Sequence, residues 1–292
     1  MDKLVEICRW LGGRVPHWIQ GKGGNVSVKE GNRLWIKASG AHVSDVSASH
    51  GVACVDLLRF NDLRQGAPPA DAEGWYAETL TRCATGHARP SMETGFHALL
   101  PGAWVVHVHS LAAIVMAHEH ERDAAALNAF FAAHAPLAVS FVPPELPGWN
   151  LSTRLTAVAN AGAIVLANHG VIVQGDDPAG LIASWTRVEE AFCAEWGCRE
   201  LVAFGTRMAD ADLAGQPFRA YFPDAVVFQE AVEAAARRAH GAPPPASRDA
   251  QDALEILEAI ALLERACPDL GEIGSDQRAA IPALPTEAFR KA

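Results

Sequence analysis

Two histidines stand one residue apart in an otherwise apolar run, GAWVVHVHSLAAI, at residues 102–114. The valine-rich part of this run predicts a buried β-strand at 103–109, in which side chains point alternately to opposite faces. His107 and His109 therefore share one face, and the valine between them points the other way. Burying two imidazoles costs free energy unless both have polar partners, so the strand has to lie beside groups that satisfy them.

Residues two apart along a strand are separated by about 6.5–7 Å, so both rings can converge on one metal ion. A third histidine, His169, ends an apolar strand in LANHGVIV, where Gly170 permits a sharp turn. Three histidines around one ion leave a position open for substrate, as in catalytic zinc sites. The alternatives are a pair of core histidines bonded to backbone or carboxylate groups, and a turn histidine at 169 that caps a carbonyl.

The remaining pattern predicts a layered α/β fold with a mixed or mainly antiparallel sheet. Alternating apolar residues predict a hairpin at 25–37 and further strands at 52–58, 137–142 and 163–175. We expect helices at 2–11, from Ser91 to Pro101, at 111–120, 122–134, 151–162, from Pro178 onward, and at 229–239 and 249–266.

Beyond residue 200 the composition loosens, which predicts two regions. Residues 1–205 form a catalytic domain, and residues 206–292 form a C-terminal extension packed on the same domain. The extension combines a short extended segment, FPDAVVFQ at 222–229, with helices and a proline-rich linker, APPPAS at 242–247.

The formal net charge of −10, from 24 basic and 34 acidic residues, disfavours nucleic acids and anionic membranes as main partners. A small anionic substrate is still possible, because a few local donors can hold a phosphate. The N-terminus lacks the pattern of a signal peptide, and the apolar stretches are too short or too interrupted to span a membrane. The six cysteines form no C-x-x-C pair, so we expect reduced thiols in a cytoplasmic protein.

Glu93, in PSMETGFH, falls in the first turn of a predicted helix. It could act as a general acid/base beside a metal, or it could only stabilise the helix terminus. Ser91 and the pair Ser39-Gly40 could hold a phosphate, or the serines could be simple caps. Asn25, in GKGGNVS, is a further donor, but a hairpin rather than a helix follows, so this is no dinucleotide-binding loop.

The order of these motifs resembles that of the class II aldolase/adducin family. Five motifs carry the resemblance and follow one another over residues 1–205: GGNVS, KASG, PSME, HVH and NHG. PSMETGFHALLP and FPDAVVF are most similar to the aldolase part of rhamnulose-phosphate aldolases fused to dehydrogenases. The resemblance implies a three-layer α/β/α sandwich around a mixed, mainly antiparallel sheet, and a homotetramer with active sites at subunit boundaries.

The resemblance also implies roles for particular residues. His107, His109 and His169 match the metal ligands of the family, with Zn²⁺ expected first and Mn²⁺, Co²⁺ or Fe²⁺ as alternatives. Glu93 matches the catalytic glutamate. The positions that hold the substrate phosphate correspond to Asn25, Ser39, Gly40 and Ser91.

From these matches we expect a metal-dependent lyase of carbohydrate metabolism, which cleaves a ketose phosphate or related keto acid through a metal-stabilised enediolate. Met92 replaces a family serine and cannot donate a hydrogen bond, so a decarboxylase of a 3-oxo acid is an alternative. An epimerase or dehydratase could use the same site, and an adducin-like assembly module is the alternative without catalysis. The family also uses a catalytic tyrosine, and neither Tyr76 nor Tyr221 aligns clearly with it.

Overall fold

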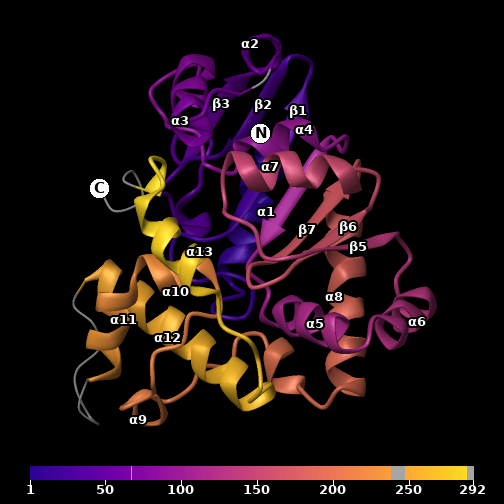
Figure 1. The fold of residues 1–292 in the computed structure, drawn as a ribbon, viewed down its shortest axis with the longest axis vertical. Coiled ribbons are helices and arrows are strands. Elements are labelled where there is room, and N and C mark those ends of the chain that lie inside the picture. Colours follow the sequence, from indigo (N-terminus) through magenta and orange to yellow (C-terminus); the bar gives the residue numbers. More distant parts are fainter. Residues whose placement is uncertain (67, 238–246, 288–292) are drawn as a thin grey trace.

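A computed structural model describes residues 1–66, 68–237 and 247–287. Its centre is a seven-stranded sheet in the order β3-β2-β1-β4-β7-β6-β5 (Figure 1). The strands are β1 (Asn25–Glu30), β2 (Arg33–Lys37), β3 (Val52–Asp56), β4 (Trp104–Val108), β5 (Val139–Val142), β6 (Ala163–Leu166) and β7 (Gly170–Gly175). All neighbouring strands are antiparallel except β5 and β6. The predicted mixed, mainly antiparallel sheet is thereby confirmed.

Most predicted helices form close to their expected positions. The helices are α1 (Asp2–Gly12), α2 (Leu57–Leu63), α3 (Ala72–Cys83), α4 (Thr94–Leu99), α5 (Leu111–Arg122), α6 (Ala124–His134), α7 (Trp149–Leu155), α8 (Pro178–Glu195), α9 (Asp210–Leu213), α10 (Pro223–Val227), α11 (Gln229–Ala236), α12 (Arg248–Ala266) and α13 (Ser275–Ala280). Helix α4 starts three residues after Ser91, so the prediction of Ser91 as its N-cap is wrong. The strand expected at 52–58 ends at Asp56, whose side chain accepts a hydrogen bond from the Arg59 amide and caps α2.

Apolar side chains on the two faces of the sheet enter different core clusters. Val106 packs in the main cluster with residues of α1, α5, α8 and α12, whereas Val105 packs with residues of α4 and α7. Because adjacent strand residues point to opposite faces, helices cover both faces of β4. Figure 1 shows α7 crossing in front of the sheet and α8 running along it.

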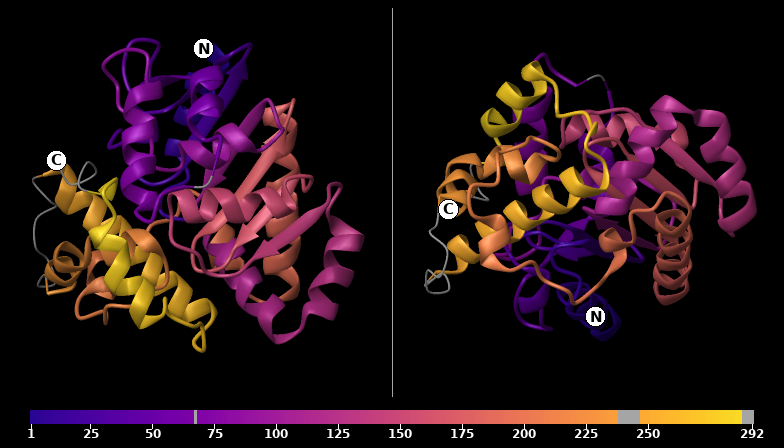
Figure 2. Two further views of the ribbon diagram at one scale, coloured as in Figure 1. Left: turned by 45° about the horizontal axis from the view of Figure 1, so that its top comes forward. Right: turned by 90° about the horizontal axis from the view of Figure 1, so that it is seen from below.

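The C-terminal segments share the main core. Phe222, Val232 and the apolar residues of α12 belong to the same cluster as α1, α5 and α8. Both views of Figure 2 show these segments, orange to yellow, gathered on one side of the molecule, away from the magenta α6. The domain boundary at residue 205 stays a prediction. The proline-rich linker falls mainly on residues 242–246, which lie outside the described residues.

One segment of the extension differs from its prediction. Residues 222–229 were expected to be extended, but α10 and the start of α11 occupy this stretch, and all five residues of α10 are buried. Pro223 is the first residue of α10, where a missing N–H costs nothing and the fixed φ suits a helix. This correction matters for the site, since α10 carries Asp224.

Two predictions about the whole chain can be compared with the structure. The six cysteines are buried and free of disulfides, as expected for reduced thiols. Across residues 1–66, 68–237 and 247–287, no helix combines the length and the apolar character that a bilayer crossing requires.

Candidate metal centre and substrate pocket

Strand β4 presents His107 at the middle of the sheet. In the register, His107 pairs with Asn25 on β1 and with Ile172 on β7. Its Nδ1 lies 3.0 Å from the carbonyl oxygen of Val171, so Nδ1–H donates there and the lone pair stays on Nε2. His109 follows the end of β4, where its backbone N–H donates to the carbonyl of Trp18.

The turn between β6 and β7 brings His169 to the same place. Asn168 has a φ of 54° and Gly170 a φ of 147°. A Cβ atom on Gly170 would lie 2.2 Å from the carbonyl oxygen of Val108, so only glycine lets the turn pack against the end of β4. The ring centroids of His107, His109 and His169 consequently lie 4.9–5.1 Å apart.

Glu93 completes the cluster. Its Oε1 lies 3.2 Å from Nε2 of His107 and 3.4 Å from Nε2 of His169, and its Oε2 accepts a hydrogen bond of 2.6 Å from Nδ2 of Asn25. One ligand atom from Glu93 and one from each histidine all lie within 4.8 Å of one another, and all four residues are buried.

The segment that carries Glu93 is fixed by hydrogen bonds to its neighbours. The Ser91 hydroxyl accepts from Nδ2 of Asn25 and from the Glu93 amide, at 2.9 and 3.2 Å. The buried Tyr76 hydroxyl donates to the Met92 carbonyl at 2.7 Å and accepts from the Gly95 amide at 2.6 Å. Tyr76 therefore supports the segment from behind, and burial raises the pKa of its hydroxyl far above the usual value.

The protonation states follow from this arrangement. Burial alone raises the pKa of Glu93, but the adjacent His107 and His169 outweigh it and hold the pKa well below the usual range. Burial lowers the pKa of His169 to about 4, despite the opposing effect of Glu93. At neutral pH the cluster thus offers a carboxylate and a neutral imidazole at His169, the forms that coordinate metal ions.

The donor set fits a divalent cation. Three imidazoles and a carboxylate are typical ligands of Zn²⁺ and related metals. Among the described residues, His107 Nε2 is a buried nitrogen that lacks a hydrogen bond of ordinary geometry. Unpaired buried nitrogens are costly in a core without a ligand. The tautomer fixed at His107 aims its lone pair at the Glu93 carboxylate and into the cluster.

A pocket opens onto this cluster. All four residues predicted to hold the substrate line this pocket, namely Asn25, Ser39, Gly40 and Ser91. Met92, Glu93, His109 and His169 line it as well. His107 has no exposed surface and lies deeper. Neither Tyr76 nor Tyr221 is among the lining residues, so this chain's own pocket contains no catalytic tyrosine from these two positions.

Sequence reasoning missed several lining residues. Lys22 and Lys37 contribute to the wall beside Ser39, and the Lys37 ammonium donates to the carbonyls of Lys22 and Ala41 at 3.0 and 2.8 Å. Asp224, from α10, also lines the pocket. Lys37 stands in the KASG motif and could have been noticed there. Asp224 is a single acidic residue in an apolar segment and gives no such signal.

Comparison with known proteins agrees with this geometry. Residues 2–195 match the family model described as the class II aldolase and adducin N-terminal domain. The chain therefore belongs to the class II aldolase and adducin family.

Individual relatives are more distant. The chain is 27% identical over 136 residues to a methylthioribulose-1-phosphate dehydratase of Cronobacter sakazakii, a match covering 44% of this chain and 54% of that protein. It is 27% identical over 180 residues to the uncharacterized oxidoreductase YuxG of Bacillus subtilis, covering 58% of this chain and 24% of that protein. The matches thus span about half of the dehydratase and about a quarter of YuxG.

A solved structure has the same fold. The N-terminal class II aldolase domain of a conserved protein from Thermoplasma acidophilum superposes with a TM-score of 0.52 at 25% sequence identity. The match covers 66% of this chain and 91% of that domain.

Proposed function

We propose that this protein is a divalent-metal-dependent lyase that cleaves a carbon–carbon bond in a ketose phosphate or a related keto acid. The observation that carries the proposal is the buried group of Glu93 and three histidines at the base of a pocket. We assign His107, His109 and His169 as metal ligands and Glu93 as the catalytic acid/base. Zn²⁺ suits this set best, with Mn²⁺, Co²⁺ or Fe²⁺ as alternatives.

When bound, the metal supplies positive charge that stabilises negative charge developing on substrate oxygens. The residues of the chain supply proton transfer and positioning. Glu93 is ionised and positioned by Asn25, so it can take a proton from the substrate or return one at the reacting carbon. The hydrogen bonds around Ser91 and Tyr76 hold its backbone, which limits the reorganisation needed during the reaction.

The polar wall of the pocket supports an anionic substrate. Ser39, Gly40 and Ser91 offer hydroxyl and backbone donors, and Lys22 and Lys37 add positive charge nearby. Asn25 lines the same wall, but its Nδ2 already donates to Ser91 and Glu93. Such groups hold either a phosphate or a carboxylate. Met92 lines the same wall with a thioether that donates no hydrogen bond, so the subsite has one donor fewer than the family pattern.

Dehydration of a sugar phosphate is the second candidate. The similarity to methylthioribulose-1-phosphate dehydratase favours it. The same site would serve, because Glu93 can also move the proton that must leave carbon when water is eliminated. Decarboxylation of a 3-oxo acid is favoured only by Met92, and epimerisation has no specific observation in its support.

The test combines metal analysis with a substrate panel. Wild-type protein and the variants His107→Ala and Glu93→Gln are loaded with Zn²⁺, Co²⁺ or Mn²⁺, dialysed, and analysed for bound metal. They are then assayed against ketose phosphates, free ketoses and 3-oxo acids, with products identified by mass spectrometry. We expect His107→Ala to lose the metal, and Glu93→Gln to keep it while turnover falls about 10²–10⁴-fold.

A matched control is His42→Ala, which removes a buried histidine that contacts Asp252 outside the cluster and should keep the metal. Full turnover in Glu93→Gln would refute the role of that residue. A wild-type protein that binds no metal and turns over no substrate would support an adducin-like assembly module instead.

We also propose that the enzyme is a cytoplasmic homotetramer. The family resemblance supports both statements. Light scattering of the purified protein tests the assembly, and a monomer at micromolar concentration would contradict it.

A further inference from the structure

The extension places a carboxylate beside one of the histidines. Asp224, on α10, has no exposed surface, and its Oδ2 lies 3.2 Å from Nδ1 of His109. It is not a member of the four-residue group whose ligand atoms are mutually within 4.8 Å. Asp224 therefore contacts the cluster from outside, through His109.

The backbone of Gly23 covers this contact. A Cβ atom at Gly23 would lie 2.7 Å from Oδ2 of Asp224 and 2.8 Å from Nδ1 of His109. Real Cβ atoms do not approach other atoms so closely, so only glycine admits both side chains here. The tight fit fixes the imidazole and the carboxylate against each other.

Hydrogen bonds tie the segment just before α10 to the turn that carries His169. Nδ2 of Asn168 donates to the carbonyls of Tyr221 and Gly271, at 3.2 and 2.8 Å. Asn168 directly precedes His169, and Tyr221 stands three residues before Asp224. The position of Asp224 is thus set by the same turn that sets a proposed metal ligand.

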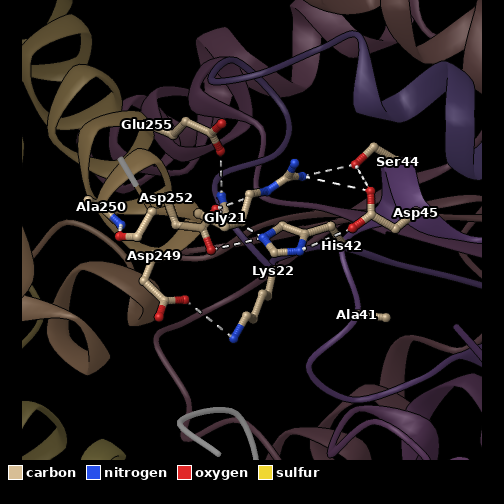
Figure 3. Close-up of polar contacts among 12 residues, drawn as sticks. Gly21, Lys22, Ala41, His42, Ser44, Asp45, Asp249, Ala250, Asp252 and Glu255 are labelled. Carbon is tan, nitrogen blue, oxygen red and sulfur yellow. Dashed lines mark hydrogen bonds and ion pairs between the residues drawn. The ribbon is translucent and has the colours of Figure 1, made fainter. Parts of the chain in front are cut away.

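A second set of contacts anchors the glycine-rich segment to α12 (Figure 3). Figure 3 shows Gly21, Lys22 and His42 facing acidic residues of that helix. The Gly21 amide donates to Glu255 at 2.9 Å, Nε2 of His42 lies 2.9 Å from Asp252, and Lys22 lies 3.9 Å from Asp249. The segment that leads into Gly23 is therefore held against α12 of the extension by Gly21 and Lys22.

We propose that Asp224 is a positioning residue for His109. Its carboxylate accepts a hydrogen bond from Nδ1–H of that imidazole, which fixes the ring and leaves the lone pair on Nε2 for the metal. Carboxylates that hold metal-binding histidines in this way commonly raise metal affinity 10–100-fold. The inference rests on the proposed function, because it assumes that the histidines bind a metal.

The test measures metal affinity rather than turnover alone. Asp224→Asn, Asp224→Ala and Asp224→Glu are titrated with Zn²⁺ in competition with a chromophoric chelator, and circular dichroism checks that each variant is folded. We expect the Asn and Ala variants to bind Zn²⁺ about 10–100-fold more weakly, with Asp224→Glu closer to wild type. The absorption bands of bound Co²⁺ should also shift in Asp224→Asn, because the geometry at one ligand changes.

Asp252→Asn is the matched control. It neutralises another buried aspartate of the same extension, one that contacts His42 and none of the cluster histidines. It should retain the Zn²⁺ affinity and the Co²⁺ spectrum of wild type. A loss of affinity in Asp252→Asn equal to that in Asp224→Asn would mean that the extension acts only through general stability, and would overturn the proposal.

The outcomes separate this inference from the proposed function. If His107→Ala abolishes binding while Asp224→Asn binds Zn²⁺ like wild type with an unchanged Co²⁺ spectrum, Asp224 has no positioning role and the metal centre stands. A rise in KM alone in Asp224→Asn, with unchanged metal affinity, would make Asp224 a substrate contact and also overturn the proposal. Wild-type protein that binds no metal would contradict the proposed function itself.

Discussion

Replacing Gly170 by alanine should disturb the fold and the proposed metal centre together. Gly170 has a φ of 147°, and a Cβ atom there would lie 2.2 Å from the Val108 carbonyl oxygen and 2.8 Å from Cα of His109. The backbone of the β6–β7 turn or the end of β4 would have to move to relieve these contacts. His109 and His169 belong to the two segments that would separate.

The size of the effect can be worked out from two contributions. A non-glycine residue held in this region of φ costs about 1–3 kcal/mol. Relieving a contact of 2.2 Å needs a shift of about 1 Å in two strands that are buried and paired, which adds about 2 kcal/mol, comparable to overpacking in a core. We therefore expect Gly170→Ala to lower the free energy of unfolding by about 3–5 kcal/mol and Tm by roughly 5–8 °C.

Gly31→Ala separates backbone strain from crowding. Gly31 also has a positive φ, 58°, in the turn between β1 and β2, but nothing lies within 4 Å of its would-be Cβ atom. It should cost only about 1–2 kcal/mol and leave Zn²⁺ affinity unchanged. Urea unfolding and a Zn²⁺ competition titration on both variants give the comparison. Gly170→Ala with the stability and the Zn²⁺ affinity of Gly31→Ala would refute the reasoning.

Three further predictions follow from polar side chains and their hydrogen bonds. Burial raises the pKa of Glu189 to about 7. The folded state therefore binds the proton of the Glu189 carboxyl more tightly than the unfolded state does. The free energy of unfolding should fall by about 3 kcal/mol as pH rises from about 4.5 to 7. Urea titrations at several pH values should show this decrease in wild type and not in Glu189→Gln. Tyr76→Phe removes two hydrogen bonds to the segment that carries Glu93 and should lower the free energy of unfolding by about 2 kcal/mol, and unchanged urea midpoints would contradict this support. Asn168→Gly keeps the positive φ but loses both bonds to the extension, so it should lose about 1–2 kcal/mol and Asn168→Ala about 1 kcal/mol more, in the same assay.

Local alternation was enough to predict most strands and to place His107 and His109 on one face, whereas the resemblance to the class II aldolase family joined His169 to them. The valines that flank His107 define its strand and its face, and the NHG motif marks the turn that brings in His169. Each of these sequence patterns lies within a few residues of the histidine whose position it predicts. The sheet order and the approach of Gly170 to β4 needed the structure, because they depend on pairing between distant strands.

The extension shows why the rest could not be predicted. FPDAVVFQ is rich in valine and phenylalanine, which favours an extended segment, yet packing of all five α10 residues in the interior makes it helical. Tertiary burial outweighs propensity in such a short element. Asp224 could not be found either, since its meaning depends on His109 and Gly23, which are remote in sequence.

Asp224 lies beyond residue 195, where the family match ends. A relative can therefore preserve every matched motif and still place a different side chain against the histidine that corresponds to His109. When a reaction or a substrate is inferred for one family member from another, the C-terminal tails have to be compared as well as the shared domain. In this fold the three histidines lie within or directly beside strands of the matched domain, whereas the carboxylate that contacts His109 comes from the tail outside it.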